Sequence, residues 1–499
     1  MGSAYILAID QGTTSTRAAI FNELGQGIAS VGREFRQHYP KPGWVEHDPL
    51  GIWQTVAEVV PEALAQARIA PQELAGIGLT NQRETVVLWD RATSQPVAPG
   101  IVWQDRRTAA FCKEHHADEP WLFERTGLVL DPYFSATKIR WLLENDPTIQ
   151  SRAKSGHLAV GTIDSWLLWN LTGGAVHATD YSNASRTLLM NLHTARWDTE
   201  LCRYFDVPEA ILPDAKPSVS RFGVTAALPF LPAGIPICGI AGDQQAALFG
   251  QGGFRTGEGK CTYGTGAFFL LNTGVKPIRS QHRLLSSLAA MTDTTPQYVL
   301  EGSVFVAGAA IQWLRDGLHL LARASDSEAL ATRSSPEEPT LFVPGLVGLG
   351  APHWIPEARG VLFGLTRKTS PADLARAALE GVALQVVDLI AAADLDTGVP
   401  LDGLRVDGGM SRNAWFLQCQ ADLLGLPVLP ALEKEATALG AAFLAGLQVG
   451  VWPDLDAIRK MTLSSQRFEP TWNQEQRERK LRNWRRAVAA TIAYYRDEA

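Results

Sequence analysis

The stretch Tyr5–Phe21, YILAIDQGTTSTRAAIF, predicts the architecture of this chain. An apolar run, a short polar turn that contains Gly12, and a second apolar run are typical of a β-hairpin. The turn collects hydroxyl side chains and backbone amides at the end of a buried strand. Strand-like and helix-like segments then alternate to the end of the chain, which is the pattern of an α/β protein.

The second part of the chain repeats this plan. A glycine-bearing turn, Gly264–Gly266, again separates two strand-like runs, and a strand follows a long helix in both parts. We therefore predict two related domains, 1–249 and 250–499, with an insertion in the first at about 110–230. The spacing of apolar and capping residues predicts helices and strands over particular stretches. The helices are expected over 49–67, 307–321 and 371–395, and the strands over 74–82, 235–242 and 403–411.

Composition excludes several classes of protein. The 499 residues are 46% hydrophobic and 19% charged, which is typical of a globular protein, and the net charge of −7 argues against a nucleic-acid partner. No apolar run is long enough to cross a membrane, and the N-terminal residues lack the pattern of a signal peptide. The five cysteines are scattered, which favours a reducing compartment over a disulfide framework or a zinc site. We expect a cytoplasmic protein without membrane insertion.

The first turn has the chemistry of a phosphate site. Gly12 allows close backbone approach, the hydroxyls of Thr13, Thr14 and Ser15 can donate, and Arg17 can place a guanidinium against phosphate oxygens. Asp10 ends the preceding strand and is a hard oxygen ligand that suits Mg²⁺, directly or through water. An ordinary polar hairpin turn is the alternative interpretation.

A second turn and an aspartate complete the pattern. The turn at Thr265 could hold a nucleotide's phosphates from the opposite side of a cleft, although an isolated Gly-Thr-Gly is also a common β-turn. Neither turn matches a P-loop or a dinucleotide-binding motif. Asp243 follows an apolar strand and opens a helix. It could be a helix N-cap, or it could be the general base that accepts a proton from an attacking hydroxyl.

Nine motifs lie in the order found in one enzyme family. They are DQGTTSTR (10–17), KPGWVEHDP (41–49), GLTNQRE (78–84), WQDRRT (103–108), DPYFSATK (131–138), AGDQQAALFGQ (241–251), TYGTG (262–266), AGAAIQWLRD (307–316) and VDGGMSRN (406–413). With them the chain resembles the FGGY carbohydrate kinases, and among these the members that phosphorylate glycerol. The resemblance implies two ribonuclease H-like domains, of the actin, hexokinase and Hsp70 type, around a central cleft. It also implies ATP and Mg²⁺ as cofactors, glycerol as substrate, and a homodimer or homotetramer.

The resemblance also implies roles for particular residues. Asp243 is expected to be the catalytic base and, with Asp10, a Mg²⁺ ligand, either directly or through water. The glycerol pocket is expected to comprise Arg83, Glu84, Tyr133, Asp243, Gln244, Trp103 and Phe268. The nucleotide site is expected to comprise Thr13, Thr14, Ser15, Arg17, Thr265, Gly308, Gln312, Gly409 and Asn413. An Arg–Glu pair suits a small triol, because selectivity for hydroxyls requires both donors and acceptors.

The sequence departs from the family pattern at three places. The segment Phe230–Pro236 stands where regulated bacterial members carry a Gly-Gly-Thr-Arg loop for fructose 1,6-bisphosphate, and the absence of arginine argues against inhibition through this loop. His353 and Ile355 replace a tyrosine and an aspartate. The segment Met410–Arg412 replaces the usual small residues near the nucleotide.

Other functions remain open from the sequence. One is a kinase of the same family that acts on another polyol or sugar, such as erythritol, xylulose or gluconate. Another is a non-catalytic ATP-dependent sensor on the same fold, and a third is an actin-like filament or chaperone. A substrate panel with ATP separates the first from glycerol phosphorylation, and a complete lack of phosphoryl transfer would favour the others.

Overall fold

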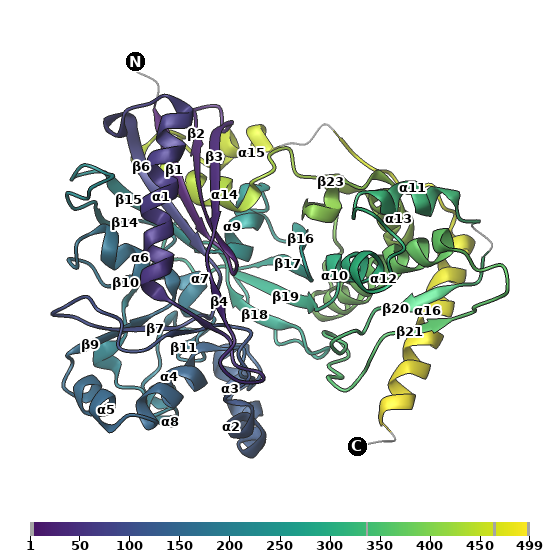
Figure 1. The fold of residues 1–499 in the computed structure, drawn as a ribbon, viewed down its shortest axis with the longest axis horizontal. Coiled ribbons are helices and arrows are strands. Elements are labelled where there is room, and N and C mark those ends of the chain that lie inside the picture. The colour runs from purple at the N-terminus through teal and green to yellow at the C-terminus, as the bar shows by residue number, and fades with distance from the viewer. Residues whose placement is uncertain (1–3, 336–337, 463–465, 497–499) are drawn as a thin grey trace.

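Two six-stranded sheets organise the molecule (Figure 1). The computed structural model describes residues 4–335, 338–462 and 466–496. The first sheet, in spatial order, is β14 (Val219–Val224), β15 (Pro236–Gly242), β6 (Leu74–Asn81), β1 (Tyr5–Gln11), β2 (Ser15–Phe21) and β3 (Gly27–Glu34). The second sheet is β18 (Leu285–Leu288), β19 (Tyr298–Val304), β17 (Ala267–Gly274), β16 (Gly259–Tyr263), β22 (Leu404–Gly408) and β23 (Val428–Pro430).

The two sheets share one topology. In the first, β1, β2 and β3 are antiparallel neighbours, and β6 and β15 run parallel to β1. In the second, β16, β17 and β19 are antiparallel neighbours, and β22 and β23 run parallel to β16. Each sheet adds one further edge strand, β14 or β18. The repeat that the two turns predicted is therefore present, and its strand order is that of a ribonuclease H-like fold.

Helices cover both faces of the first sheet. Alternate residues of β1 point to opposite faces, so Leu7 and Ile9 pack with α1 (Pro49–Ala67) and α6 (Ile163–Leu171). Ile6 and Ala8 pack against α14 (Ala436–Val449) on the other face. Helix α1 begins where the sequence predicted, because the side chain of Asp48 caps the Leu50 amide and Pro49 occupies the first turn.

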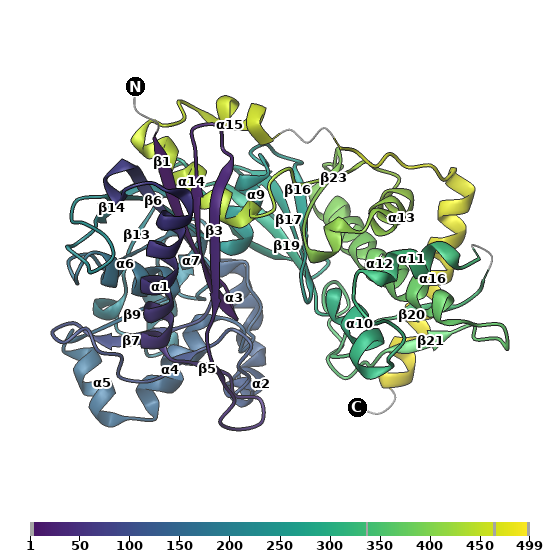
Figure 2. The same cartoon turned by 45° about the horizontal axis from the view of Figure 1, so that its top comes forward.

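The helices α9 (Asp243–Gly250) and α14 (Ala436–Val449) cross between the two sheets. Although α14 follows the second sheet in sequence, it lies on the first sheet, as Figure 2 shows. The contact is close enough that a Cβ built on Gly440 would lie 1.8 Å from the Ala246 carbonyl oxygen. Glycine is therefore required for these helix backbones to meet.

The second sheet has one apolar face and one mixed face. Leu300 and Val304 of β19 join the core that α10 (Gly308–Gln312), α12 (Pro371–Thr397) and α13 (Ala414–Leu424) cover. The alternate residues of this strand, among them Glu301, face the first half of the chain. The segment 475–486 is rich in charged residues and belongs to α16 (Gln474–Arg496), whose buried Leu481 and Trp484 pack on the core of the second half.

The insertion at 110–230 is mainly helical and has a core of its own. Its helices are α2 (Ala109–Glu114), α3 (Glu119–Thr126), α4 (Ser135–Glu144), α5 (Pro147–Lys154), α6, α7 (Tyr181–Ala184) and α8 (Thr199–Tyr204). A small three-stranded sheet consists of β4 (Gln37–His38), β5 (Glu46–His47) and β8 (Gly100–Ile101). Two-stranded sheets pair β7 (Val87–Asp90) with β9 (Leu158–Gly161), β10 (Ala178–Asp180) with β13 (Asp214–Lys216), and β11 (Met190–Asn191) with β12 (Arg196–Trp197). The second half adds α11 (Asp326–Arg333), α15 (Leu455–Thr462), β20 (Leu341–Val343) and β21 (Val361–Phe363).

One predicted helix is shorter than expected. The prediction over 307–321 is wrong beyond Gly317, because α10 continues only as a π-helical turn over Trp313–Gly317. His319 then adopts a left-handed backbone, with φ of 54°, which a continuing helix does not allow. Within the described residues, no helix has the length and apolar character needed to span a bilayer.

Candidate active site

The first polar turn joins β1 to β2 and is closed by its own backbone. The Gly12 amide donates to the Ser15 carbonyl oxygen at 2.9 Å. The hydroxyl of Thr13 accepts a hydrogen bond from the indole N–H of Trp103 at 2.9 Å, so this turn contacts the predicted polyol pocket. Arg17 lies on β2, and its guanidinium pairs with Glu435 at 2.7 Å. Glu435 directly precedes α14, so this ion pair links the strand after the first turn to the later part of the chain.

Asp10 lies at the end of β1, opposite Arg17 in the β1–β2 register. Burial, reinforced by the negative charge of Asp243, raises the pKa of Asp10 from 3.8 to about 7. The described residues contain no group of three His, Cys, Asp or Glu side chains that could hold a metal. Mg²⁺ needs fewer protein ligands, because it keeps several waters and binds one or two carboxylates together with substrate phosphates. Asp10 and Asp243 fit such a site.

The second turn and α10 are built as one unit. The Thr265 carbonyl oxygen accepts from the amides of Ala307 at 2.8 Å and Ala309 at 3.1 Å, and the Gly308 amide donates to the Gly264 carbonyl oxygen at 2.9 Å. A Cβ on Gly308 would lie 2.6 Å from that oxygen, so only glycine fits. The structure thus brings the predicted residues Thr265 and Gly308 together, with the start of α10 seated on the turn.

The remaining predicted nucleotide residues lie on neighbouring elements of the second half. Gln312 ends α10, and Gly409 follows β22. A Cβ on Gly409 would have no heavy atom within 4 Å, so this backbone borders open space into which a ligand can come close. Asn413 caps α13 by accepting from the Phe416 amide at 2.9 Å, which gives this residue a structural role in addition to its predicted one.

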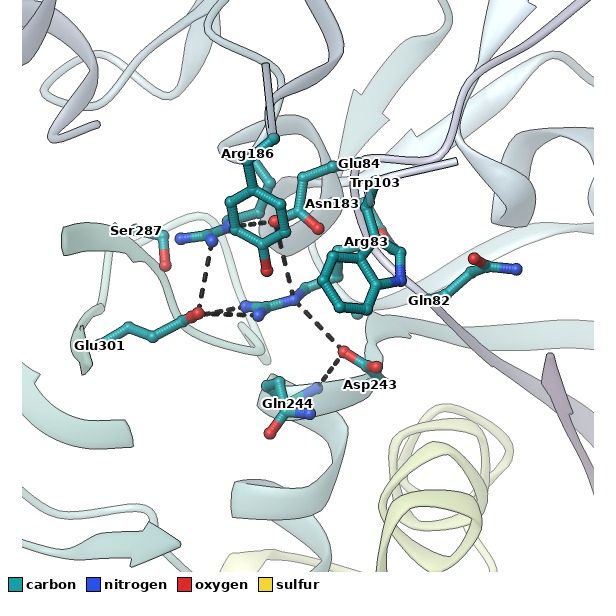
Figure 3. Close-up of polar contacts among 12 residues, drawn as sticks. Gln82, Arg83, Glu84, Trp103, Asn183, Arg186, Asp243, Gln244, Ser287 and Glu301 are labelled. Atoms are coloured by element: carbon teal, nitrogen blue, oxygen red, sulfur yellow. Dashed lines mark hydrogen bonds and ion pairs between the residues drawn. The ribbon is translucent and has the colours of Figure 1, made fainter. Parts of the chain in front are cut away.

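The predicted polyol residues from the first half come together in one pocket (Figure 3). Arg83 and Glu84 follow β6, and Glu84 adopts a left-handed backbone with φ of 61°. Such strain is uncommon outside glycine and is typical of functional sites. The rings of Trp103 and Tyr133 pack edge to face with centroids 5.5 Å apart. Burial, with the Glu84 charge nearby, raises the pKa of Tyr133, so its hydroxyl keeps its proton.

Asp243 is the first residue of α9, and its carboxylate is 30% exposed. The N-cap interpretation is wrong, because Gly242 occupies the cap position. Oδ1 of Asp243 accepts from the Gln244 amide at 2.7 Å and lies 3.3 Å from Nε of Arg83. Burial raises the pKa of Asp243, while the positive charges of Arg83 and Lys260 act in the opposite direction. A basic carboxylate with one uncommitted oxygen can accept a proton from a bound hydroxyl.

Gln244 and Phe268 connect the pocket to the second sheet. The side-chain oxygen of Gln244 accepts a hydrogen bond from Nζ of Lys260, which also donates to the Thr262 hydroxyl at 2.6 Å. Phe268 of β17 is half-buried and pairs with Ser303 of β19, so it lies on the sheet face that carries Glu301. Phe268 is therefore on the side of the second half that faces the pocket, and Gln244 of the first half contacts that side through Lys260.

Sequence reasoning missed three charged residues of this pocket. Arg186 and Glu301 pair with Glu84 and Arg83, and Lys260 holds Gln244. All three are fully buried. Their signal in the sequence is a charge within an otherwise apolar or small-residue stretch, as in YVLEGSV (298–304). Buried charges are rare unless they are paired, so each such charge indicates a partner elsewhere.

Known proteins share this organisation over the whole chain. Sequence profiles of the FGGY family of carbohydrate kinases match residues 5–250 with the N-terminal domain and residues 259–449 with the C-terminal domain. The chain is 51% identical to a protein named glycerol kinase from Bordetella parapertussis, over 99% of this chain and 98% of the relative. It is 52% identical to a glycerol kinase from Deinococcus radiodurans, over 97% of each chain.

Solved structures agree. The crystal structure of Plasmodium falciparum glycerol kinase with ADP superposes with a TM-score of 0.92 at 36% identity, over 98% of each chain. A ligand-bound xylulose kinase from Lactobacillus acidophilus, at 22% identity, has a TM-score of 0.87 over 99% of this chain and 100% of that one, and shares the fold. From these matches and the doubled topology, the chain belongs to the FGGY family of carbohydrate kinases.

Proposed function

We propose that this protein transfers the γ-phosphoryl group of ATP to a terminal hydroxyl of glycerol, giving sn-glycerol 3-phosphate and ADP in glycerol catabolism. One observation carries the proposal. A carboxylate with a raised pKa, Asp243, lies 3.3 Å from the Arg83 guanidinium in a pocket that also holds Glu84. The names of the Bordetella, Deinococcus and Plasmodium relatives support glycerol as the acceptor.

In this mechanism the pocket positions the acceptor and removes its proton. Arg83 donates to the hydroxyls, Glu84 accepts from them, and Trp103, Tyr133 and Phe268 border the carbon chain. Asp243 takes the proton of the terminal hydroxyl of glycerol. The oxygen of that hydroxyl attacks the γ-phosphorus in line. The new O–P bond forms as the bond to ADP breaks, so the displaced electron pair leaves with ADP.

The two turns are proposed to bind the phosphates. Thr13, Thr14, Ser15 and Arg17 act from the first half, and Gln244 supports the base. Asp10 and Asp243 would hold Mg²⁺, whose charge would neutralise phosphate oxygens. On the second half the proposed nucleotide contacts are Thr265, Gly308, Gln312, Gly409 and Asn413. Closure of the cleft excludes water that would otherwise hydrolyse ATP.

The test is a coupled assay of ADP release against a substrate panel. Glycerol should give a kcat/KM at least tenfold above erythritol, xylulose and gluconate, because the pocket offers its donors and acceptors to a short polyol. A higher value for a longer substrate would assign the chain to another specificity of the same family. No ADP release with any of them would favour a sensor that binds ATP without catalysis.

A further proposal concerns location and assembly. We propose a cytoplasmic homodimer or homotetramer, on the strength of the family resemblance, and light scattering on the purified protein tests the oligomeric state.

We also propose that the domain boundary lies between Phe249 and Gly250, at the end of α9. The division between the two family profiles, at residues 250 and 259, supports this position.

A further inference from the structure

The two arginines of the pocket share one carboxylate, and it comes from the other half of the chain. Glu301 of β19 accepts from Nη1 of Arg83 at 2.6 Å and from Nη2 at 2.9 Å. Its Oε1 also accepts from Nη2 of Arg186 at 3.3 Å. Burial alone would raise the pKa of Glu301, but the two guanidiniums hold it at about 2. Glu301 is therefore ionised at neutral pH.

This pairing decides which edge of Arg83 can bind a ligand. A guanidinium has five N–H donors in a fixed plane. Glu301 accepts from one N–H of Nη1 and from one N–H of Nη2. The side-chain oxygen of Gln245 accepts from the second N–H of Nη1 at 3.2 Å. The donors left are Nε–H and one N–H of Nη2, which lie on one edge. Nε lies 3.3 Å from Asp243 and 4.0 Å from Glu84, so the free edge opens between these carboxylates.

Arg186 decides in a similar way which oxygen of Glu84 can bind a ligand. Its Nε donates to Oε1 of Glu84 at 2.6 Å, which commits that oxygen and leaves Oε2 to accept from a ligand. The Arg186 guanidinium carbon lies 5.6 Å from the ring centroid of Tyr133 and 5.2 Å from that of Phe134, so the side chain is also fixed by packing. Glu301 in turn accepts from Arg186, so this one glutamate fixes both Arg83 and the Arg186–Glu84 pair.

We propose that Glu301 and Arg186 are positioning residues for polyol phosphorylation. They aim the free edge of Arg83 and the free oxygen of Glu84 at adjacent hydroxyls of a short polyol. Because Glu301 belongs to the second sheet, the polyol pocket is complete only when the two halves stand in this arrangement. This inference rests on the proposed function and adds residues outside the expected polyol set.

The test compares glycerol kinetics of the wild type with Glu301→Gln, which preserves size and removes the charge. The glycerol KM should rise about 10- to 100-fold, the loss expected when a charge-assisted hydrogen-bond anchor is removed, while the KM for ATP changes less than about threefold. The kcat with saturating glycerol should change less than about threefold, because the aimed groups bind the ground state and the transition state alike. A residue that only stabilises the fold would not separate the glycerol KM from kcat in this way.

A matched control is Glu380→Gln. Glu380 is also a buried carboxylate of the second half, paired with Arg376 and Lys480, and it is on α12, away from the pocket. Its glycerol KM and kcat should equal those of the wild type. Glu301→Asp keeps the charge that pairs with both guanidiniums, so its glycerol KM should lie closer to the wild-type value than that of Glu301→Gln.

Three results would be informative. A folded Glu301→Gln variant, verified by circular dichroism, with the wild-type glycerol KM overturns the inference while leaving the proposed function intact. A wild-type protein that phosphorylates none of the polyols overturns the proposed function itself. If Glu301→Gln does not fold, Arg186→Lys takes its place, since lysine cannot hold both carboxylates in one plane. That variant should raise the glycerol KM at least tenfold, and an unchanged KM overturns the inference.

Discussion

Replacing Asp243 with asparagine tests the proposed chemistry most directly. The substitution keeps the size of the side chain and an oxygen that can accept from the Gln244 amide, now 2.7 Å from Oδ1. Arg83 loses a charge at 3.3 Å but remains held by Glu301. The pocket should therefore persist, and what disappears is the ability to take a proton.

The expected loss is large and lies in turnover. A positioned general base contributes about 10²–10⁴ in rate, which corresponds to roughly 3–5 kcal/mol of activation free energy. We expect kcat of Asp243→Asn to fall by this factor. The glycerol KM should change less than about threefold, because the Arg83 edge and Glu84 still bind the ground state.

The assay is ADP release under saturating ATP, Mg²⁺ and glycerol, followed across pH. In the wild type, kcat/KM should fall on the acid side as Asp243 gains a proton, at a pH above the usual range of an aspartate because burial raises its pKa. Asp388→Asn is the control, since Asp388 is a half-buried carboxylate on α12 that pairs with His353. A variant at Asp243 that keeps more than a tenth of the wild-type kcat would refute the assignment of the base.

Other changes have distinct outcomes. Asp10→Asn should stabilise the protein by about 4 kcal/mol at pH 8, because the pKa of Asp10 rises from 3.8 to about 7 on folding and each pKa unit corresponds to about 1.4 kcal/mol. Between these two values folded Asp10 keeps a proton that the unfolded chain releases, so the stability of the wild type falls as the pH rises through this window. The gain should vanish near pH 4 in thermal denaturation, and a gain equal at both pH values would contradict this reasoning. Trp103→Phe loses the hydrogen bond to Thr13 and should lower kcat/KM about fivefold. An unchanged kcat/KM would show that this hydrogen bond does not contribute to catalysis. Gly440→Ala forces a Cβ to 1.8 Å from the Ala246 carbonyl and should cost more than about 2 kcal/mol in urea unfolding; wild-type stability would mean that the helices separate freely.

Local patterns were sufficient for much of the fold. The run Tyr5–Phe21 contains both strands and the turn between them, and Asp48 with Pro49 marks the start of α1. Each of these patterns depends on a few neighbouring residues, so the local structure that it predicts is also present in the folded protein. The helix expected over 307–321 ends earlier, because the chain passes through a π-helical turn over Trp313–Gly317 and His319 then takes a left-handed backbone.

The candidate site was only partly predictable, for a physical reason. Motifs identified Arg83, Glu84 and Asp243 because these residues stand beside recognisable strand ends. Their partners are far away in sequence: Arg186 is 102 residues from Glu84, and Glu301 is 218 residues from Arg83. The alternation in β19 does place Glu301 on the face opposite Leu300, but no local pattern states which surface that face meets.

The ion pair between Arg83 and Glu301 has a consequence for engineering. A chimera that joins the first half of this chain to the second half of a distant relative would inherit two buried guanidiniums, and it would work only if the donor supplies a carboxylate at the matching strand position. Fragment complementation faces the same demand. Substrate preference in such hybrids should therefore track the compatibility of the joined halves, rather than the identity of either one alone.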